Sequence, residues 1–203
     1  SGQADIAAVK AEGLAVGGRI DMSNAEVHLS GTQANTLITE GLQFASGDTN
    51  IALDVTSAAG THLSTSLKDL QKLGVDAVSA VGDLDGNAAT VNSISVDLGS
   101  GAALSANGLP LFGDSNLDNV LSATEDSALN VTLDVSGAGQ LHELAGLAGG
   151  ANLSGIGLDN VDVSLQGLAD LNAVLSASGQ ADIAAVKAEG LAVGGTIDMS
   201  NAE

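Results

Sequence analysis

The first and last 26 residues of this chain are almost the same sequence. Ser1–Glu26 reads SGQADIAAVKAEGLAVGGRIDMSNAE, and Ser178–Glu203 differs from it only by having Thr196 in place of Arg19. The two copies begin 177 residues apart. Near identity at a fixed offset indicates recent tandem duplication rather than convergence on a common pattern.

Two interpretations of this duplication remain open. In the favoured one, residues 1–177 are one tandem-repeat unit and residues 178–203 begin the next unit. In the other, a short terminal segment has been duplicated in an otherwise unique protein. The first interpretation predicts a fold whose two ends match each other.

Alternating apolar residues inside the unit predict short strands with one buried face. The predicted strands share an apolar residue, often β-branched, at every second position, and they are Glu26–Ser30, Ile51–Thr56, Ser93–Leu98, Asn130–Val135 and Asn160–Leu165. The glycine pairs Gly17–Gly18 and Gly194–Gly195 are expected to form tight corners between elements.

The clearest helix is predicted over Leu63–Val75, where leucines at four-then-three spacing form one apolar stripe. Ser64 or Thr65 would cap its start, and Gly74 stands where a left-handed C-terminal residue belongs. Looser helical patterns cover Ala4–Val16, Thr32–Phe44, Gly101–Phe112, Gln140–Leu147 and Leu168–Leu175.

The order of strand, short helix and glycine turn recurs every ~25 to 45 residues, a period typical of stacked repeats. We therefore predict an α/β protein, a repetitive solenoid of short parallel strands alternating with short helices, with about five such sub-repeats in a unit. The alternative is an all-β sandwich of the kind found in adhesin extender domains. The helix over Leu63–Val75 favours the solenoid.

The charge balance excludes several classes of function. Five Lys and Arg face 25 Asp and Glu, a net charge of −20. Nucleic-acid binding, which depends on Lys and Arg neutralising phosphates, is therefore not expected. No membrane insertion is expected either, because uncharged stretches such as Leu144–Leu158 are too short and too polar. The absence of cysteine excludes disulfides and thiolate metal sites.

One segment has the alternating oxygen ligands of a calcium loop, namely Asp83, Asp85 and Asn87. However, Gly86 comes early for such a loop, and Ile94 stands where a bidentate Glu belongs. A turn between strands is the favoured interpretation, and Ca²⁺ is the one cofactor left open. Weaker runs of the same kind are Asp114–Asn119 and Asp159–Asp162.

No catalytic residues are predicted. His28, His62 and His142 lack the spacing of metal ligands and are expected at the surface or at strand edges. Lys68 and Lys72 lie four residues apart on the polar face of the Leu63–Val75 helix, where solvation is the expected state. Few aromatic, His and Arg residues are available to build an enzyme pocket, so the chain is not expected to be an enzyme.

Five segments follow one another in the first part of the unit, namely Val27–Ser30, Thr32–Asn35, Glu40–Phe44, Ala45–Thr49 and Leu67–Ala77. With these segments in this order, residues 26–83, roughly a third of the unit, resemble the repeats of giant bacterial surface and secreted proteins. Members of that class are very long, acidic, cysteine-free chains that are often exported by type I secretion and are adhesin-like. The Gly-Gly-x-Gly-x-Asp calcium repeat of the class is absent here.

The resemblance implies a structural repeat module of a large extracellular bacterial surface protein, acting as spacer, stalk or filament body in adhesion or surface coating. Its expected partners are neighbouring repeats of the same chain, and the same surfaces could join separate chains into fibres. The alternative is a glycan- or protein-binding module on a repeat scaffold. An enzyme such as a polysaccharide lyase or hydrolase is the third hypothesis.

Overall fold

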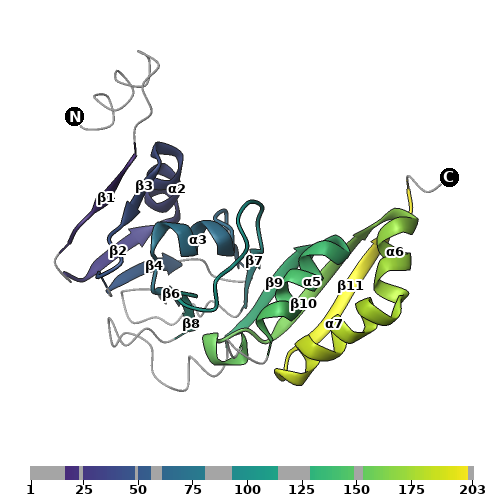
Figure 1. The fold of residues 1–203 in the computed structure, drawn as a ribbon. Helices are drawn as coiled ribbons and strands as arrows, with labels where there is room; N and C mark the ends of the chain where they lie inside the picture. The colour runs from purple at the N-terminus through teal and green to yellow at the C-terminus, as the bar shows by residue number, and fades with distance from the viewer. Residues whose placement is uncertain are drawn as a thin grey trace, which may run out of the picture.

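The computed structural model describes residues 17–22, 25–48, 50–55, 61–80, 93–113, 129–148 and 153–200. The structure in these ranges is mixed α/β, with strands and short helices interleaved along the chain. Figure 1 shows that the elements follow one another in chain order from one end of the molecule to the other.

The earlier elements are β1 (Gly18–Ile20), β2 (Val27–Ser30), α2 (Gly31–Glu40), β3 (Leu42–Phe44), β4 (Ile51–Val55), β5 (Thr61–His62), α3 (Leu67–Leu73) and β6 (Ala77–Ala80). The later elements are β7 (Ser93–Asp97), β8 (Leu111–Gly113), β9 (Asn130–Ser136), α5 (Gly137–Leu147), the 3-10 turn η1 (Leu153–Ile156), β10 (Asn160–Gln166), α6 (Gly167–Leu175), α7 (Ala177–Ala188) and β11 (Ala192–Asp198).

The described strands form three sheets, and every strand pair in them is parallel. One sheet has the order β2-β4-β6-β8, a second has the order β5-β7-β9-β10-β11, and β1 pairs with β3. Neighbours in each sheet are therefore also neighbours in chain order within it. From β4 to β9 the chain alternates between the two larger sheets. The α/β prediction is confirmed, whereas an extender sandwich would need antiparallel sheets.

The register of the sheets shows how much chain separates neighbouring strands. Val27 pairs with Ile51, 24 residues later, and Ser93 pairs with Asn130, 37 residues later. The other neighbouring strands fall between these two separations. Each of these intervals holds the turn or helix that returns the chain to the next parallel strand.

The core consists of apolar side chains stacked in columns across the sheets. In the first large sheet the column is Leu29, Leu53, Val78 and Phe112; in the second it is Val96, Leu133 and Val161. All of these side chains are buried. Burying a Val, Leu or Phe side chain stabilises a fold by about 1.5–3 kcal/mol relative to leaving it exposed. Repetition of such columns explains why Leu and Val recur at every second strand position.

Helix α3 confirms the predicted apolar stripe. Leu63, Leu67, Leu70 and Leu73 are all buried. Gly74 ends the helix with φ 86°, the left-handed conformation that a side chain would strain.

The start of α3 differs from the prediction. Ser66 caps the helix, rather than Ser64 or Thr65. The reason is that the Leu63 N–H donates to the Ser95 carbonyl at 2.8 Å, so the chain is still paired with β7 at this point. Because of this pairing, the helix begins about one turn further along the chain than predicted.

Helix α2 is shorter than the predicted Thr32–Phe44. It ends at Glu40, where Gly41 takes φ 72° and reverses the chain. Leu42–Phe44 then forms β3, because it pairs with β1. The glycine, rather than the apolar pattern, decides the boundary.

No helix forms over the predicted Gly101–Phe112. Gly101 has φ 103° and Gly108 has φ 77°, both outside the helical region. Pro110 lacks an N–H, and β8 begins immediately afterwards at Leu111.

Of the remaining predictions, the strands and the C-terminal helices are confirmed, and most of the glycine corners are wrong. The five predicted strands correspond to β2, β4, β7, β9 and β10, and the two predicted C-terminal helices to α5 and α6. The predicted glycine corners are wrong at Gly18, Gly194 and Gly195, which lie inside β1 and β11. The predicted helix over Ala4–Val16 lies outside the described residues. None of the described helices is long and apolar enough to cross a membrane.

Candidate functional site

Three carboxylates accept hydrogen bonds from backbone N–H groups that lie earlier in the chain. We call Asp48, Asp76 and Asp159 the strand-start carboxylates, because each lies just before a strand. They accept from the N–H groups of Met22 (3.0 Å), Ile51 (3.0 Å) and Val131 (2.8 Å), each 25 to 28 residues earlier. A hydrogen bond to a charged group is worth about 1.5–3 kcal/mol.

Asp76, like Asp159, also bonds through its own backbone to the strands on both sides. Besides its side-chain bond, its own N–H donates to the Ile51 carbonyl at 2.9 Å, and its carbonyl accepts from Leu111 at 2.9 Å. One residue thus ties β4 to β8. Burial raises the pKa of the Asp76 carboxyl, the Ile51 N–H opposes this rise, and the nearby charge of Asp48 adds to it.

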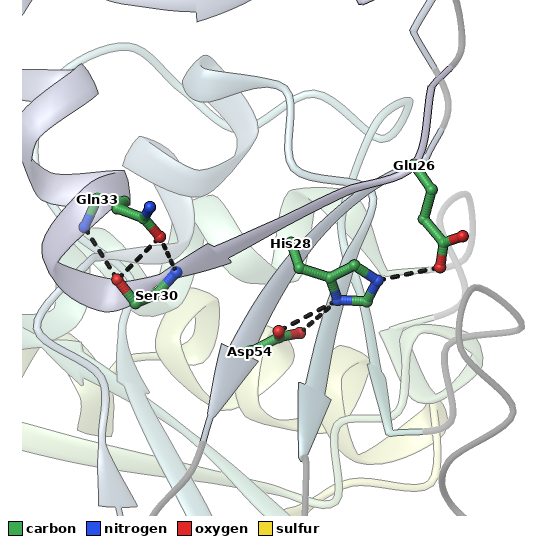
Figure 2. Close-up of polar contacts among 5 residues, drawn as sticks. All are labelled: Glu26, His28, Ser30, Gln33 and Asp54. Carbon is green, nitrogen blue, oxygen red and sulfur yellow. Dashed lines mark hydrogen bonds and ion pairs between the residues drawn. The ribbon is translucent and has the colours of Figure 1, made fainter. Parts of the chain in front are cut away.

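His28 on β2 lies between two carboxylates, as Figure 2 shows. Its Nδ1 lies 2.9 Å from Asp54 Oδ1 on β4, and its Nε2 lies 3.0 Å from Glu26 Oε1. The hydrogen bonds to Asp54 and then to Glu26 raise the pKa of His28, against a smaller lowering by burial. The side chain is 34% exposed, which agrees with its predicted surface position. The cluster fixes β2 on β4 electrostatically.

The same strand continues into a helix through a capping box, also visible in Figure 2. Gln33 Oε1 accepts from the Ser30 N–H at 2.8 Å, and the Ser30 hydroxyl accepts from the Gln33 N–H at 3.4 Å. Two N–H groups at the helix start are satisfied reciprocally. Ser30 therefore ends β2 and begins α2 with no loop between them.

A column of three aspartates runs across the second large sheet. Asp97, Asp134 and Asp162 stand at matching positions on β7, β9 and β10. His62 Nε2 lies 3.4 Å from Asp97, and its Nδ1 lies 3.7 Å from Asp134. Burial raises the pKa of Asp134, as do the charges of Asp97 and Asp162, whereas His62 lowers it.

His142 and Glu143 are adjacent in sequence, but their side chains contact different partners. His142 Nδ1 lies 3.0 Å from Asp182, which joins α5 to α7, and its side chain is 76% exposed. Glu143 Oε2 accepts from Lys68 Nζ at 2.8 Å, and its Oε1 accepts from the Leu104 N–H at 2.9 Å. The two side chains do not form an acid–base pair.

The expectation of a solvated Lys68 is wrong. Its side chain is only 9% exposed, and α5 supplies its partner Glu143. Nothing near Lys68 in the sequence indicates this, because the partner lies 75 residues away. Lys72, one helical turn later, is exposed as expected.

The described residues do not test the predicted metal ligands. Asp83, Asp85 and Asn87 lie outside the described residues, as does Asp114–Asn119. Asp159 binds the Val131 N–H, while Asp162 belongs to the aspartate column. Across the described ranges, no three His, Asp or Glu side chains are placed to hold a metal ion. Calcium binding at residues 83–87 stays a prediction.

Comparisons with protein-family models, with curated proteins and with solved structures gave no match for this chain.

Proposed function

We propose that this chain is a structural repeat module of a large extracellular bacterial surface protein, in which the strands and helices stack as an α/β solenoid and act as spacer, stalk or filament body. The observation that carries the proposal is the strand order: parallel strands follow chain order through both larger sheets. Stacking of this kind adds length rather than bulk as the chain grows.

The mechanism is geometric. Parallel strands lie about 4.8 Å apart, so a unit of about five stacked sub-repeats adds about 25 Å to a stalk. Apolar columns bury each layer on the next, and the strand-start carboxylates bond backbone N–H groups across layers. Cohesion is therefore nearly constant for each added layer, whatever the total length.

The acidic surface suits a long extracellular chain. A net charge of −20 makes neighbouring stalks repel one another and keeps them soluble. The basic side chain of Lys68 is used inside the fold, in the ion pair with Glu143. Adhesion to other molecules is then the task of other parts of the parent protein, with this region setting their distance from the cell.

The test compares proteins with one, two and three tandem units, in which residues 27–203 are repeated after Glu203. Small-angle X-ray scattering should give a maximum dimension that rises by about 25 Å for each added unit at an unchanged cross-section. A cross-section that grows with unit number, or units that tumble as separate globules, would overturn the proposal. Specific glycan binding by the 203-residue chain would replace it with the binding-module alternative.

A further inference from the structure

The two copies of the duplicated segment pair with different neighbours. In the N-terminal copy, β1 pairs with β3. In the C-terminal copy, β11 pairs with β10 and stands at the end of its sheet. Gly18–Ile20 corresponds to Gly195–Ile197, with Arg19 in place of Thr196. The corresponding strand therefore pairs with a later strand in the first copy and with an earlier strand in the second.

The backbone shows that the two copies use opposite edges of this strand. Successive residues of a strand direct their N–H and C=O groups to opposite edges. In β11 the Ala192 N–H donates to Asp159 at 3.0 Å, so alternate residues from Ala192 onward face β10, and Gly195 and Ile197 face the open edge.

In β1 the positions that correspond to Gly195 and Ile197 are the ones that bond to β3. The Gly18 N–H donates to the Gly41 carbonyl at 3.4 Å, and the Ile20 carbonyl accepts from Ala45 at 2.8 Å. The edge left open in one copy is thus the edge used in the other.

The apolar side chains of the two copies differ in the same complementary way. Ile197 is 52% exposed and Met199 is 41% exposed. Their counterparts Ile20 and Met22 are partly buried and pack against the core. The Met22 N–H is also held by Asp48. The environment that Ile197 and Met199 lack is therefore the one that the segment after residue 26 supplies to their counterparts.

We infer that β11 is a shared strand: at a joint between units it pairs with β10 of its own unit on one edge and with β3 of the following unit on the other. The occupant of the open edge is a second copy of the unit, beginning with the segment equivalent to Val27–Val55. This inference rests on the proposed function and specifies the contact between its units.

The register of the joint follows from the two existing pairs. Leu165 pairs with Ile197, and Ile20 pairs with Phe44, so Ile197 lies between Leu165 and the following unit's Phe44. Leu165 and Phe44 are both buried, and the joint extends their apolar layer. The one difference between the copies, Arg19 against Thr196, is exposed in both and leaves this layer unchanged.

Disulfide trapping in a two-unit protein tests this register, because the chain contains no cysteine of its own. The protein is the 203-residue chain continued by a second copy of residues 27–203. Thr196→Cys in the first unit is combined with Gln43→Cys in the second, since Arg19 pairs with Gln43. Neighbouring strands about 4.8 Å apart fall within the Cα separation that a disulfide spans.

The expected result is rapid formation of this disulfide on mild oxidation, seen by mass spectrometry of proteolytic fragments. The positive control is Arg19→Cys with Gln43→Cys within the first unit, which are already neighbours. The negative control replaces the second cysteine by Thr32→Cys at the exposed start of the second unit's α2. Formation of the positive-control bond without the joint bond would overturn the inference.

A second measurement uses Ile197→Asp in the one-unit and two-unit proteins. In the one-unit chain the side chain is half exposed, so little change in Tm is expected. At the joint the same substitution should lower the Tm of the two-unit protein by about 5 °C, because a charge would then be buried. Equal effects in both proteins would contradict the shared strand.

The two proposals fail in different ways. If scattering shows regular elongation but the joint disulfide does not form, the spacer function stands and the shared strand is wrong. If the disulfide forms in a protein whose length does not increase regularly, the shared strand stands and the spacer function is wrong.

Discussion

The ammonium group of Lys68 lies 2.8 Å from the carboxylate of Glu143. This ion pair joins α3 to α5 across 75 residues of sequence. The side chains are 9% and 24% exposed, and the Leu104 N–H donates to the second carboxylate oxygen. A pair this well covered differs from a surface ion pair, because loss of one partner leaves the other charge without compensation.

We expect Lys68→Met to destabilise the fold by about 1–3 kcal/mol, because Glu143 keeps its burial and loses its charged donor. Chemical denaturation at pH 7 measures the effect. Lys72→Met on the same helix is the matched control, since Lys72 is exposed, and it should change the free energy of unfolding by less than about 0.5 kcal/mol. Equal losses in the two variants would contradict a role for the ion pair.

The same pair predicts part of the acid sensitivity of the protein. Burial raises the pKa of Glu143, but the bonds from Lys68 and Leu104 outweigh it, and the net pKa is lowered from 4.5. A lowered carboxyl pKa stabilises the fold above the unfolded-state pKa, and the stabilisation is lost as pH falls through the folded-state pKa. Glu143→Gln should therefore flatten the stability curve below about pH 4.5. An unchanged slope there would exclude this contribution.

His28 should titrate above 6.5, because the hydrogen bonds to Asp54 and Glu26 favour its charged form. A raised histidine pKa adds stability that is complete below the unfolded-state pKa and is lost as pH rises through the folded-state pKa. NMR titration of the imidazole measures the shift directly. In Asp54→Asn the pKa of His28 should fall, since the larger of the two contributions is removed. A His28 pKa at or below 6.5 in the unmodified chain would contradict the contacts seen here.

Asp76 should tolerate an amide better than a methyl group. Asp76→Ala removes the acceptor of the Ile51 N–H and should cost about 1–3 kcal/mol. Asp76→Asn keeps an acceptor oxygen and removes a charge whose burial raises the carboxyl pKa, so it should cost much less. Because that pKa is raised, the contribution of the Asp76 carboxyl to stability should decline as pH rises from 3.8 through the folded-state value, a decline that Asp76→Asn removes. Equal losses for both variants would indicate that the acceptor oxygen has no role.

Asp134→Asn should stabilise the protein at neutral pH and low ionic strength. Burial and the neighbouring charges of Asp97 and Asp162 disfavour the ionised carboxylate, and His62 compensates them only in part. Removing one like charge from a cross-strand column gains about 0.2–1 kcal/mol. Thermal unfolding with and without 0.5 M NaCl is the measurement, and the gain should shrink in salt, where charges are screened within about 10 Å or less. A destabilised variant would show that the carboxylate is needed as an acceptor.

Gly195 allows β11 to lie close to β10. A Cβ at this position would overlap the backbone carbonyl of Val163, whereas one at Gly194 would meet no atom. Gly195→Ala should therefore cost about 1–3 kcal/mol, with Gly194→Ala as the control on the same strand. Gly18→Ala, the same glycine in the other copy, should also be tolerated, because its Cβ would meet only a Leu42 methyl at 3.6 Å. Similar Tm values for Gly195→Ala and Gly194→Ala would contradict the close approach.

Much of the fold was predictable from local pattern. Period-two alternation located β2, β4, β7, β9 and β10, and the leucine stripe located α3, because each element must bury one face. The predicted helix over Gly101–Phe112 failed because positive φ angles at Gly101 and Gly108 override apolar spacing. The strand-start carboxylates were missed, since an Asp before a strand is also the ordinary composition of a turn.

The sequence by itself determined the α/β class, the periodic strands and the near identity of the two ends, because these follow from side-chain alternation and from direct comparison of residues 1–26 with 178–203. Only the tertiary structure decided that Lys68 meets Glu143, that Asp76 bonds Ile51, and that β1 and β11 use opposite edges of corresponding strands. These contacts join residues 24 to 75 positions apart, and that pairing is set by how the strands stack in register, a property that no local window of sequence contains.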